Sequence, residues 1–423
     1  MLNRRNILQG VVVGALTLPS SRLRAGTAAP GGGAYTASDE AYWARIAAQY
    51  DVTDAVIQLE NGNWGIMSRP VLAAYQQAVA RVNRDNSYYA RRTMNGDLSK
   101  AHERLCTFLG VERDEIVLTR NATEALKALI GGYNRIGPGE AALYADLDYG
   151  SMQASLVAGM ARRGARTIKI ALPEPATYQN VIDSYEQAFD SWPEIRLVLL
   201  THVSHRTGLL IPVAEIAAMA RARGIDVIVD AAHSLGQVDF ALPALGADFA
   251  GLNLHKWMGA PLGVGAAYIR KGRVDSIDPD IADEDPDSGS IRSRVHTGTT
   301  DFAAVLTLPE ALEFQSSIGS RRRARRLIDL RDRWVRQVRD LPGIEVLTPD
   351  DRRMHAGITS FRLVGHVSEA ENRDLAQTLL DRFNIFTVYR TGLASGACVR
   401  VTPALFNSMD DADALASALQ LLA

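Results

Sequence analysis

Short apolar runs alternate with helix-like segments along the chain from about Ser99 to Gly265. The apolar runs are rich in β-branched residues and lack a polar face, as expected of strands that are buried on both sides of a sheet. We predict strands at 116–119, 141–144, 166–170, 195–201, 225–230 and 247–252, and helices at 97–110, 122–130, 149–162, 178–189 and 212–223. The first helix is expected to start at Asp97 as its N-cap and to stop at Gly110. This alternation predicts an α/β fold with a mostly parallel central sheet and helices on both faces.

The pattern changes after about Ala303. Residues 306–337 read as one or two long helices, because apolar residues recur along them at helical spacing. Strand-like and helix-like runs then alternate, as at 357–363 and 372–383, which predicts a smaller α+β domain. The arginine-rich stretch from Arg321 to Arg326 is most simply the solvated start of a helix.

The start of the chain resembles a targeting segment. Arg4 and Arg5 precede a mild apolar stretch, residues 7–18, that is too short to span a bilayer. Small residues follow, and cleavage after Ala28 is plausible. We therefore expect residues 1–28 to be a twin-arginine signal peptide, the export machinery to be a partner, and the mature protein to reach the periplasm already folded.

Charge and cysteine content narrow the class of protein. The formal net charge is −2, and it becomes −6 without the four arginines of the predicted leader. Such a surface argues against nucleic acid as the main partner. The two cysteines, Cys106 and Cys398, are too few for a disulfide framework, although they could form a single disulfide bond. After the leader, no apolar run approaches the length of a membrane span.

A lysine and a carboxylate follow two successive predicted strands. Asp230 ends the strand at 225–230, and Lys256 comes just past the strand at 247–252. Taken singly, each has an ordinary explanation, since lysines are solvated and an aspartate at a strand end forms turns. Pyridoxal 5'-phosphate (PLP) needs both groups, a lysine to bond its aldehyde and an acid at its ring nitrogen. The pair therefore indicates a PLP site with Lys256 as the catalytic residue.

The phosphate of such a cofactor needs hydrogen-bond donors, and one turn offers them. After the strand at 116–119, a short turn leads into a helix at Ala122, so several free amide groups point at one spot. Thr123 adds a hydroxyl group. Asn121 or Thr123 could also simply cap the helix, which needs no ligand. The sequence of the turn alone does not decide between a cap and a phosphate site.

Two segments resemble one family. Asp230-Ala-Ala-His233 and Asn253-Leu-His-Lys256-Trp257 are similar to the class V aminotransferases, a group that includes cysteine desulfurases, kynureninases and isopenicillin N epimerase-like proteins. The histidine-lysine-tryptophan triplet looks most like the epimerase-like branch. The resemblance covers nearly the whole chain after the first thirty residues. It implies the fold type I of PLP-dependent transferases, with a large PLP-binding domain at 66–302, a small C-terminal domain at 303–423, and an arm at 29–65 that joins the small domain.

The resemblance also implies roles for individual residues around the cofactor. The turn with Ala122 and Thr123 would grip the phosphate, and His255 would be a second phosphate ligand. His202 would stack on the pyridine ring, and His233 would bond the phenolic oxygen or cap a helix after Asp230. Asn253 stands where desulfurases usually carry serine, and His205 stands where they carry asparagine, so the roles of these two residues are open.

Three further residues are assigned from the same resemblance. Thr299, in a Gly-Thr segment, would reach the phosphate in a neighbouring subunit, which implies a homodimer with shared active sites. Arg400 and Asn61 would bind the substrate, with Arg400 on its α-carboxylate, because a guanidinium fork suits a carboxylate. A structural salt bridge is the alternative for Arg400.

The reaction is narrowed by one position. Desulfurases of one group carry Arg-Thr-Gly-x-x-Cys, with the cysteine as sulfur acceptor, whereas this chain has Ser395 there. We therefore expect an aminotransferase- or epimerase-like enzyme acting on a small molecule or peptide that carries an amino acid group. Export makes it similar to the periplasmic enzymes that tailor the glutamate side chain of pyoverdine siderophores. Cleavage of a C–S bond, as in a cysteine desulfurase or lyase, and a non-catalytic binding module are the alternatives.

Overall fold

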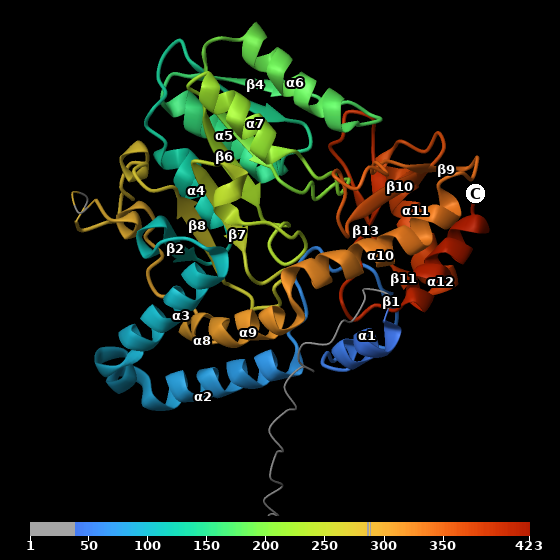
Figure 1. Ribbon diagram of the computed structural model, residues 1–423, viewed down its shortest axis with the longest axis horizontal. Coiled ribbons are helices and arrows are strands. Elements are labelled where there is room, and N and C mark those ends of the chain that lie inside the picture. The colour runs from blue at the N-terminus through green and yellow to red at the C-terminus, as the bar shows by residue number, and fades with distance from the viewer. Residues whose placement is uncertain (1–38, 286, 288) are drawn as a thin grey trace, which may run out of the picture. The chain divides into compact units, whose positions relative to one another are not determined.

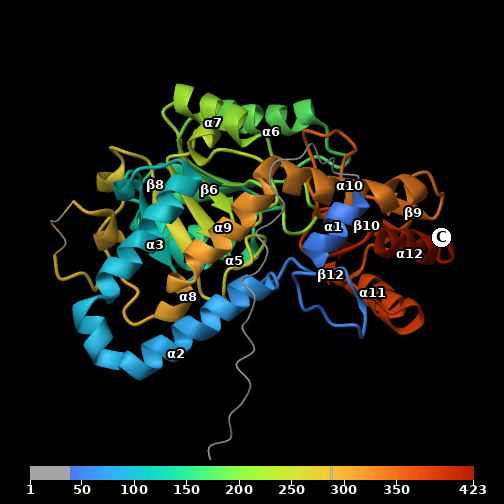
Figure 2. The ribbon, with the colours of Figure 1, turned by 60° about the horizontal axis from the view of Figure 1, so that its bottom comes forward.

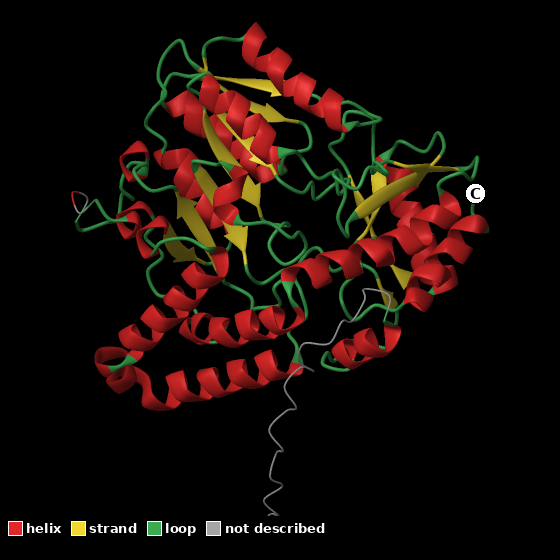
Figure 3. Ribbon diagram, in the orientation of Figure 1, coloured by secondary structure: helices red, strands yellow, loops and turns green. Residues whose placement is uncertain are grey.

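The central sheet has seven strands in the order β2-β8-β7-β6-β5-β3-β4 (Figures 1 and 3). It is seen in a computed structural model that describes residues 39–285, 287 and 289–423; the predicted signal peptide lies outside these residues. Strands β3 to β7 run parallel, and β8 is antiparallel to both of its neighbours. The strands are β2 Ile116–Thr119, β3 Ala141–Ala145, β4 Arg166–Ile170, β5 Ile195–Thr201, β6 Asp226–Ala231, β7 Phe249–Asn253 and β8 Gly265–Ile269. The predicted mostly parallel α/β sheet is confirmed.

Helices cover both faces of this sheet. Helices α4 and α5 pack on one face, while α6 and α7 lie over the other, together with α3 and α9 toward the β2 edge (Figures 1 and 2). The helices of this part are α2 Arg69–Arg92, α3 Met94–Leu109, α4 Ala122–Gly132, α5 Gly150–Arg162, α6 Tyr178–Ser191, α7 Val213–Ala222, α8 Phe302–Leu306 and α9 Leu308–Ile318. The short 3₁₀ helices are η1 Arg113–Glu115, η2 Leu242–Leu245, η3 Val274–Ser276 and η5 Ile291–Arg294.

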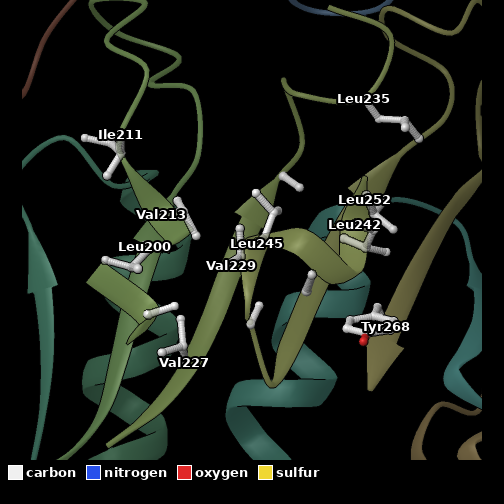
Figure 4. Packing of buried hydrophobic residues seen from close by; sticks show 14 of the residues in the cluster. Leu200, Ile211, Val213, Val227, Val229, Leu235, Leu242, Leu245, Leu252 and Tyr268 are labelled. Carbon is white, nitrogen blue, oxygen red and sulfur yellow. The ribbon is translucent and has the colours of Figure 1, made fainter. Parts of the chain in front are cut away.

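Alternate residues of each strand enter opposite hydrophobic cores. In β6, Val227 and Val229 belong to the core under α6 and α7, whereas Ile228 points into the core under α4 and α5. Figure 4 shows the first of these cores, where Val229, Leu252 and Tyr268 come from successive strands and Leu242 and Leu245 come from η2. Each fully buried aliphatic side chain contributes about 1.5–3 kcal/mol. This two-sided burial explains why the inner strands are mostly apolar, whereas the edge strand β4 exposes Arg166 and Lys169.

A second sheet of four antiparallel strands follows in the chain, in the order β12-β13-β10-β9. Its strands are β9 Ile344–Val346, β10 Thr359–Leu363, β12 Val388–Arg390 and β13 Cys398–Val401. The helices are α10 Ser320–Val338, α11 Glu369–Phe383 and α12 Met409–Gln420. Trp334, Phe361 and Leu415 are buried in their shared core. The α+β character predicted for this region is confirmed, whereas the predicted domain boundaries stay a prediction.

The first described residues pack against this second region. Helix α1, Glu40–Ala47, buries Trp43 in a cluster with Leu327 of α10 and with Leu405. Strand β1, Ile57–Gln58, pairs in parallel with β11, Ile385–Phe386. Residues 59–61 contact Thr402, directly after strand β13, which places the end of this arm next to the site described below.

The expected start of one helix was wrong. The helix expected at 97–110 begins at Met94 with Thr93 as its N-cap, and Asp97 lies in its first turn, where it accepts a hydrogen bond from Tyr89. The expectation of one or two long helices at 306–337 is confirmed, because this stretch forms α9 and α10, which are separated by Gly319 with φ of 88°, and α8 ends at Leu306. Among the described residues, no helix is long and apolar enough to cross a membrane.

The arginine-rich start of α10 was expected to be solvated, and this expectation was wrong, because two of its arginines are buried. Arg326 is 1% exposed and binds Glu40 of α1, and its Nη2 also donates to the carbonyl of Asn407. Arg323 is 2% exposed and donates to the carbonyl of Gln315. The arm covers this part of the helix, and it supplies the carboxylate that pairs with Arg326.

Candidate active site

A large cavity lies at the carboxyl ends of the parallel strands. Its volume is about 1140 Å³, and its floor includes Thr201 at the end of β5, Asp230 in β6 and Asn253 at the end of β7. Ligands of open α/β sheets bind at this edge, where the strand order changes direction. Residues of α11 and β12 line the other side of the cavity, so both sheets contribute to it.

Lys256 lies in the loop after β7 and projects into this cavity. The arm packs closely behind it: the amide of Gly65 donates to the carbonyl of His255, and a Cβ at Gly65 would come within 2.0 Å of the carbonyl oxygen of Lys256. Burial lowers the pKa of the Lys256 amine from 10.5 to about 8, although the nearby Asp230 carboxylate opposes this shift. A substantial fraction of the amine is therefore unprotonated and nucleophilic near neutral pH.

His233 holds the amine of Lys256 in a defined orientation. Trp257 Nε1 lies 3.3 Å from His233 Nδ1, and His233 Nε2 lies 3.0 Å from Lys256 Nζ. An indole N–H can only donate, so His233 Nδ1 must be the acceptor and Nε2 carries the proton. Burial and the positive charge of Lys256 hold the pKa of His233 well below 6.5, so the ring stays neutral. When Lys256 is neutral, His233 therefore donates to its lone pair. The helix that His233 was expected to cap is absent from the described residues at 232–241, where the chain forms turns.

Asp230 is buried on the cavity floor with part of its bonding capacity unused. Its Oδ1 accepts a hydrogen bond from the Ala232 amide at 3.0 Å, and Oδ2 takes none within the described residues. Burial raises the pKa of this carboxyl, while Lys256 lowers it. A cationic N–H group that entered the cavity could donate a hydrogen bond to the free Oδ2 and stabilise the ionised form of Asp230. The protonated ring nitrogen of PLP is such a group.

The turn before α4 leaves a donor free for an anion. Asn253 Oδ1 accepts from the Ala122 amide at 2.8 Å, and Asn121 caps the helix by accepting from the Glu124 amide at 2.8 Å. Between them, the amide and hydroxyl of Thr123 have no partner among the described residues, and Thr123 lines the cavity. Gly265 permits the close approach, because a Cβ there would lie 2.6 Å from Asn121 Cα. The free donors at the positive end of a helix suit a phosphate.

Asn253 and His255 thus take different places at this end of the cavity. Asn253 holds the start of α4 in position through Ala122, which is the role that its sequence left open. His255 lines the cavity, and its Nδ1 lies 3.1 Å from the carbonyl of Val264, to which it donates. This bond places the proton on Nδ1 and leaves Nε2 as an acceptor unless the ring is protonated. Burial lowers the pKa of His255 and thus favours the neutral ring, in which Nε2 cannot donate. The expected hydrogen bond to a phosphate therefore requires the negative charge of the phosphate to raise this pKa, so that Nε2 is protonated.

Arg400 lines the cavity but already has an internal carboxylate partner. Its Nη2 lies 2.6 and 2.8 Å from the two carboxylate oxygens of Glu60, and its Nη1 donates to the carbonyl of His205 at 2.7 Å. Gly62 leaves space for this guanidinium, because a Cβ there would lie 2.6 Å from Nη2. The salt bridge that was the alternative for Arg400 is therefore present, and the predicted contact with a substrate carboxylate stays a prediction.

Three predicted site residues do not line this cavity. His202 is 6% exposed, its ring makes an edge-to-face contact with Phe240, and its predicted stacking on the pyridine ring stays a prediction. Asn61 spends its side-chain amide hydrogens on the carbonyls of Thr402 and Gln58, so it ties the arm to β13 instead of facing a substrate. Thr299 is exposed outside the cavity, and its predicted contact with a neighbouring subunit stays a prediction.

The sequence prediction missed three residues in the region of the cavity, and it left the role of a fourth, His205, open. Tyr149, at the start of α5, lines the cavity with its ring edge-on to His205 at 5.1 Å between centroids. Tyr149 could have been found from its position, because it is an aromatic residue at the end of the loop that follows the buried strand β3. Such loops lie at the carboxyl ends of the parallel strands, where ligands bind. Arg390 also lines the cavity, and burial lowers its pKa to about 10. Glu60 lies behind Arg400, and no local pattern marked it.

Neither cysteine reaches the cavity wall. Cys398 is fully buried, and burial raises the pKa of its thiol to about 12, so the reactive thiolate is absent at neutral pH. Ser395 accepts two hydrogen bonds from Arg362 through its hydroxyl, and it also lies outside the residues that line the cavity. The described lining of the cavity therefore offers no sulfur acceptor.

Known proteins resemble this chain over 61% to 90% of its length. It is 28% identical over 397 residues to isopenicillin N epimerase of Streptomyces clavuligerus, covering 90% of this chain and 98% of that protein. It is 29% identical over 274 residues, 61% of this chain and 58% of the relative, to a probable chloroplastic L-cysteine desulfhydrase of Arabidopsis thaliana.

Among solved structures, a C-DES variant with glycine covalently linked to its PLP cofactor superposes with a TM-score of 0.74. It is 21% identical and covers 88% of this chain and 98% of that one, which supports fold type I. Residues 68–415 match the model of the aminotransferase class-V family. With Lys256, Asp230 and the open donors of Thr123 arranged to fit the lysine bond, ring nitrogen and phosphate of the cofactor, the chain belongs to this family of PLP-dependent enzymes.

Proposed function

We propose that this protein is a periplasmic PLP enzyme that acts on an amino group α to a carboxylate, with aminotransferase- or epimerase-like chemistry. The observation that carries the proposal is the cavity wall: a buried lysine of lowered pKa lies beside a neutral histidine, and no thiol faces them among the described residues. Proton transfer at the α-carbon needs a base of this kind, whereas a desulfurase of the type with a cysteine acceptor needs that thiol.

The residues of this chain would share the work as follows. Asp230 holds a positive charge at the ring nitrogen, Thr123 binds the phosphate, and the bound cofactor supplies the sink for the electron pair left at the α-carbon. Lys256 Nζ removes or returns the α-proton, because its lowered pKa lets it exchange protons near neutral pH. His233 Nε2 orients that amine.

The cavity supports a substrate larger than a free amino acid. Its volume of about 1140 Å³, which substrate and cofactor would share, is above the range usual for small-molecule sites, roughly 300–1,000 Å³, and residues of α11 line one wall. We infer that a peptide or peptide-like compound with an amino acid group enters here. Tailoring of the glutamate side chain of a pyoverdine-like siderophore fits this inference and the predicted export.

Reaction type is tested with the purified holoprotein. Exchange of the α-proton of amino-acid and peptide substrates in D₂O, followed by NMR, is expected in the wild type and is lost in Lys256→Ala. Chiral analysis and keto-acid assays then separate epimerisation from transamination. Rapid release of sulfide from cysteine would favour the activity named for the L-cysteine desulfhydrase relatives instead.

Export is tested separately from catalysis. Arg4→Lys together with Arg5→Lys keeps the charge but removes the paired arginines that the export receptor reads. The double variant is expected to accumulate in the cytosol with its cofactor bound. If it accumulates in the periplasm as the wild type does, the proposed route is wrong.

A further inference from the structure

We propose that a second pocket, which lies between the end of α3, residues 235–242 and the junction of α9 with α10, binds a small organic carboxylate with an apolar chain. The volume of this pocket is about 280 Å³, and none of its lining residues lines the active-site cavity. The pocket is therefore separate from the active site, and its occupation does not depend on the proposed function. We call it the α10 pocket, because the first residues of α10 line it.

Arg323 brings a buried positive charge to the α10 pocket. The residue is 2% exposed and lines the pocket, its Nη1 donates to the carbonyl of Gln315, and its Nε lies 3.5 Å from the carbonyl oxygen of Gly236. Within the described part of the chain, Nη2 has no hydrogen-bond partner and the guanidinium forms no ion pair. Burying an unpaired charge costs free energy, and a bound anion would offset this cost.

No other charge nearby replaces the missing partner among the described residues. Burial lowers the pKa of Arg323 from 12.5 to about 10, so the side chain is still positively charged at neutral pH. Burial also raises the pKa of Tyr50 above its usual value, which keeps this neighbouring hydroxyl neutral. Asp239 favours the charge of Arg323 only from a distance, and its own side chain is exposed to water. An anion in the pocket would thus pair with a cation that lacks a partner.

The start of α10 adds a second group that favours an anion. The helix has 19 residues, and no side chain of the described residues caps its first amides. The N-terminal end of a helix carries a partial positive charge that attracts anions. Gly319, the N-cap, and Ser320, the first helical residue, line the pocket together with Arg323. The helix end and the guanidinium therefore face one space.

The remaining wall is apolar and determines the kind of anion. Side chains of α3, of the loop before η2 and of η2 form it: Phe108, Leu109, Leu235, Val238, Phe240 and Leu242. Leu235 and Leu242 belong to the core that Figure 4 shows. An inorganic anion would leave this wall exposed to water, whereas an alkyl chain would cover it. The volume lies just below the range usual for small-molecule sites, roughly 300–1,000 Å³, so a short chain fits and a peptide does not.

The ligand class is tested with holoprotein and three probes, and each Kd is obtained by saturation-transfer difference NMR. Hexanoate carries both the carboxylate and the apolar chain, hexanol lacks the charge, and acetate lacks most of the chain. Hexanoate is expected to bind at least about tenfold more tightly than either of the other two, because a charge-assisted hydrogen bond and several buried CH₂ groups each contribute this much. Equal binding of hexanol or of acetate, or no binding of hexanoate up to about 10 mM, overturns the proposal.

Two variants test the place of binding, each with a matched control. Arg323→Gln removes the buried charge and should raise the Kd of hexanoate by at least about tenfold, whereas Arg321→Gln, at an exposed position outside the pocket lining, should leave it unchanged. Ser320→Asp adds a carboxylate at the exposed start of α10, where it competes with the ligand and favours the helix, so hexanoate should bind about tenfold more weakly. Ser317→Asp lies outside the lining and should bind hexanoate as the wild type does.

The outcomes separate this pocket from the active site and from effects on folding. If Arg323→Gln does not fold, as judged by circular dichroism, Ser320→Asp decides, because its substitution is at the surface. An unchanged Kd in Ser320→Asp refutes the assignment. Loss of hexanoate binding in Arg400→Gln that Arg323→Gln does not share also refutes it, because the carboxylate then binds in the active-site cavity. None of these results bears on the proposed function, which is tested at Lys256.

Discussion

The lowered pKa of Lys256 predicts how fast the apoprotein captures its cofactor at different pH values. Only the neutral amine attacks an aldehyde. With a pKa of about 8 instead of 10.5, about a quarter of the amine is neutral at pH 7.5, compared with about one thousandth for an ordinary lysine. The capture rate at neutral pH is therefore expected to exceed that of an ordinary lysine by about two orders of magnitude. It should rise tenfold per pH unit well below pH 8 and level off above it.

The assay mixes apoprotein with PLP in a stopped-flow instrument and records the growth of cofactor absorbance from about pH 6 to pH 10, a range that spans both pKa values. Asp230→Asn should move the midpoint below that of the wild type, because Asp230 is the group that most raises the pKa of Lys256. Asp248→Asn, a buried carboxyl immediately before the start of β7 and hence at its opposite end, should leave the midpoint in place. A rate that keeps rising through pH 10 would refute the reasoning.

Three further predictions concern neighbouring contacts. Trp257→Phe removes the donor that fixes the tautomer of His233, so the capture rate should fall several-fold, in line with about 1 kcal/mol for one hydrogen bond, while the far-UV circular dichroism stays the same. Asn253→Ala frees the Ala122 amide and should raise the dissociation constant of PLP, measured by equilibrium dialysis, by about tenfold; unchanged affinity would contradict the role of Asn253 as an anchor. Arg326→Leu should lower the free energy of unfolding in urea by about 1–2 kcal/mol, because the buried carbonyl of Asn407 loses its donor while Glu40, whose side chain is 49% exposed, is left to water. The exposed Arg321→Leu should change it by less than about 0.5 kcal/mol.

Sequence patterns predicted those parts of the fold that depend on local burial. The strand expected at 195–201 has the same bounds in the structure, because residues buried in the middle of a parallel sheet are apolar whatever lies beyond them. The edge strand at 166–170 also has its expected bounds, although Arg166 and Lys169 are exposed. Lys256 and Asp230 were also predictable, since the ends of parallel strands meet at one edge of a sheet. Both residues line the cavity there.

The features that the sequence did not reveal depend on which segments meet in space. Glu60 and Arg400 are 340 residues apart, so no local pattern marks their contact. Arg326 lies in an arginine-rich segment that is typical of a solvated helix face, and it is buried because Glu40 of the arm pairs with it. His202 and Tyr149 both follow strands, and only the path of each loop decides that Tyr149 faces the cavity while His202 packs against Phe240.

The pairing of the arm with β13 has a consequence for biosynthesis. Asn61 and Glu60 are among the first described residues, yet they are held by Thr402, near the other end of the chain. The wall behind Lys256 cannot be completed until a ribosome has released almost the entire polypeptide. A nascent or truncated chain can form the parallel sheet with Lys256 at its edge, but it lacks the cluster around Arg400. Maturation of the substrate pocket therefore has to follow the synthesis of Thr402, 342 residues after Glu60.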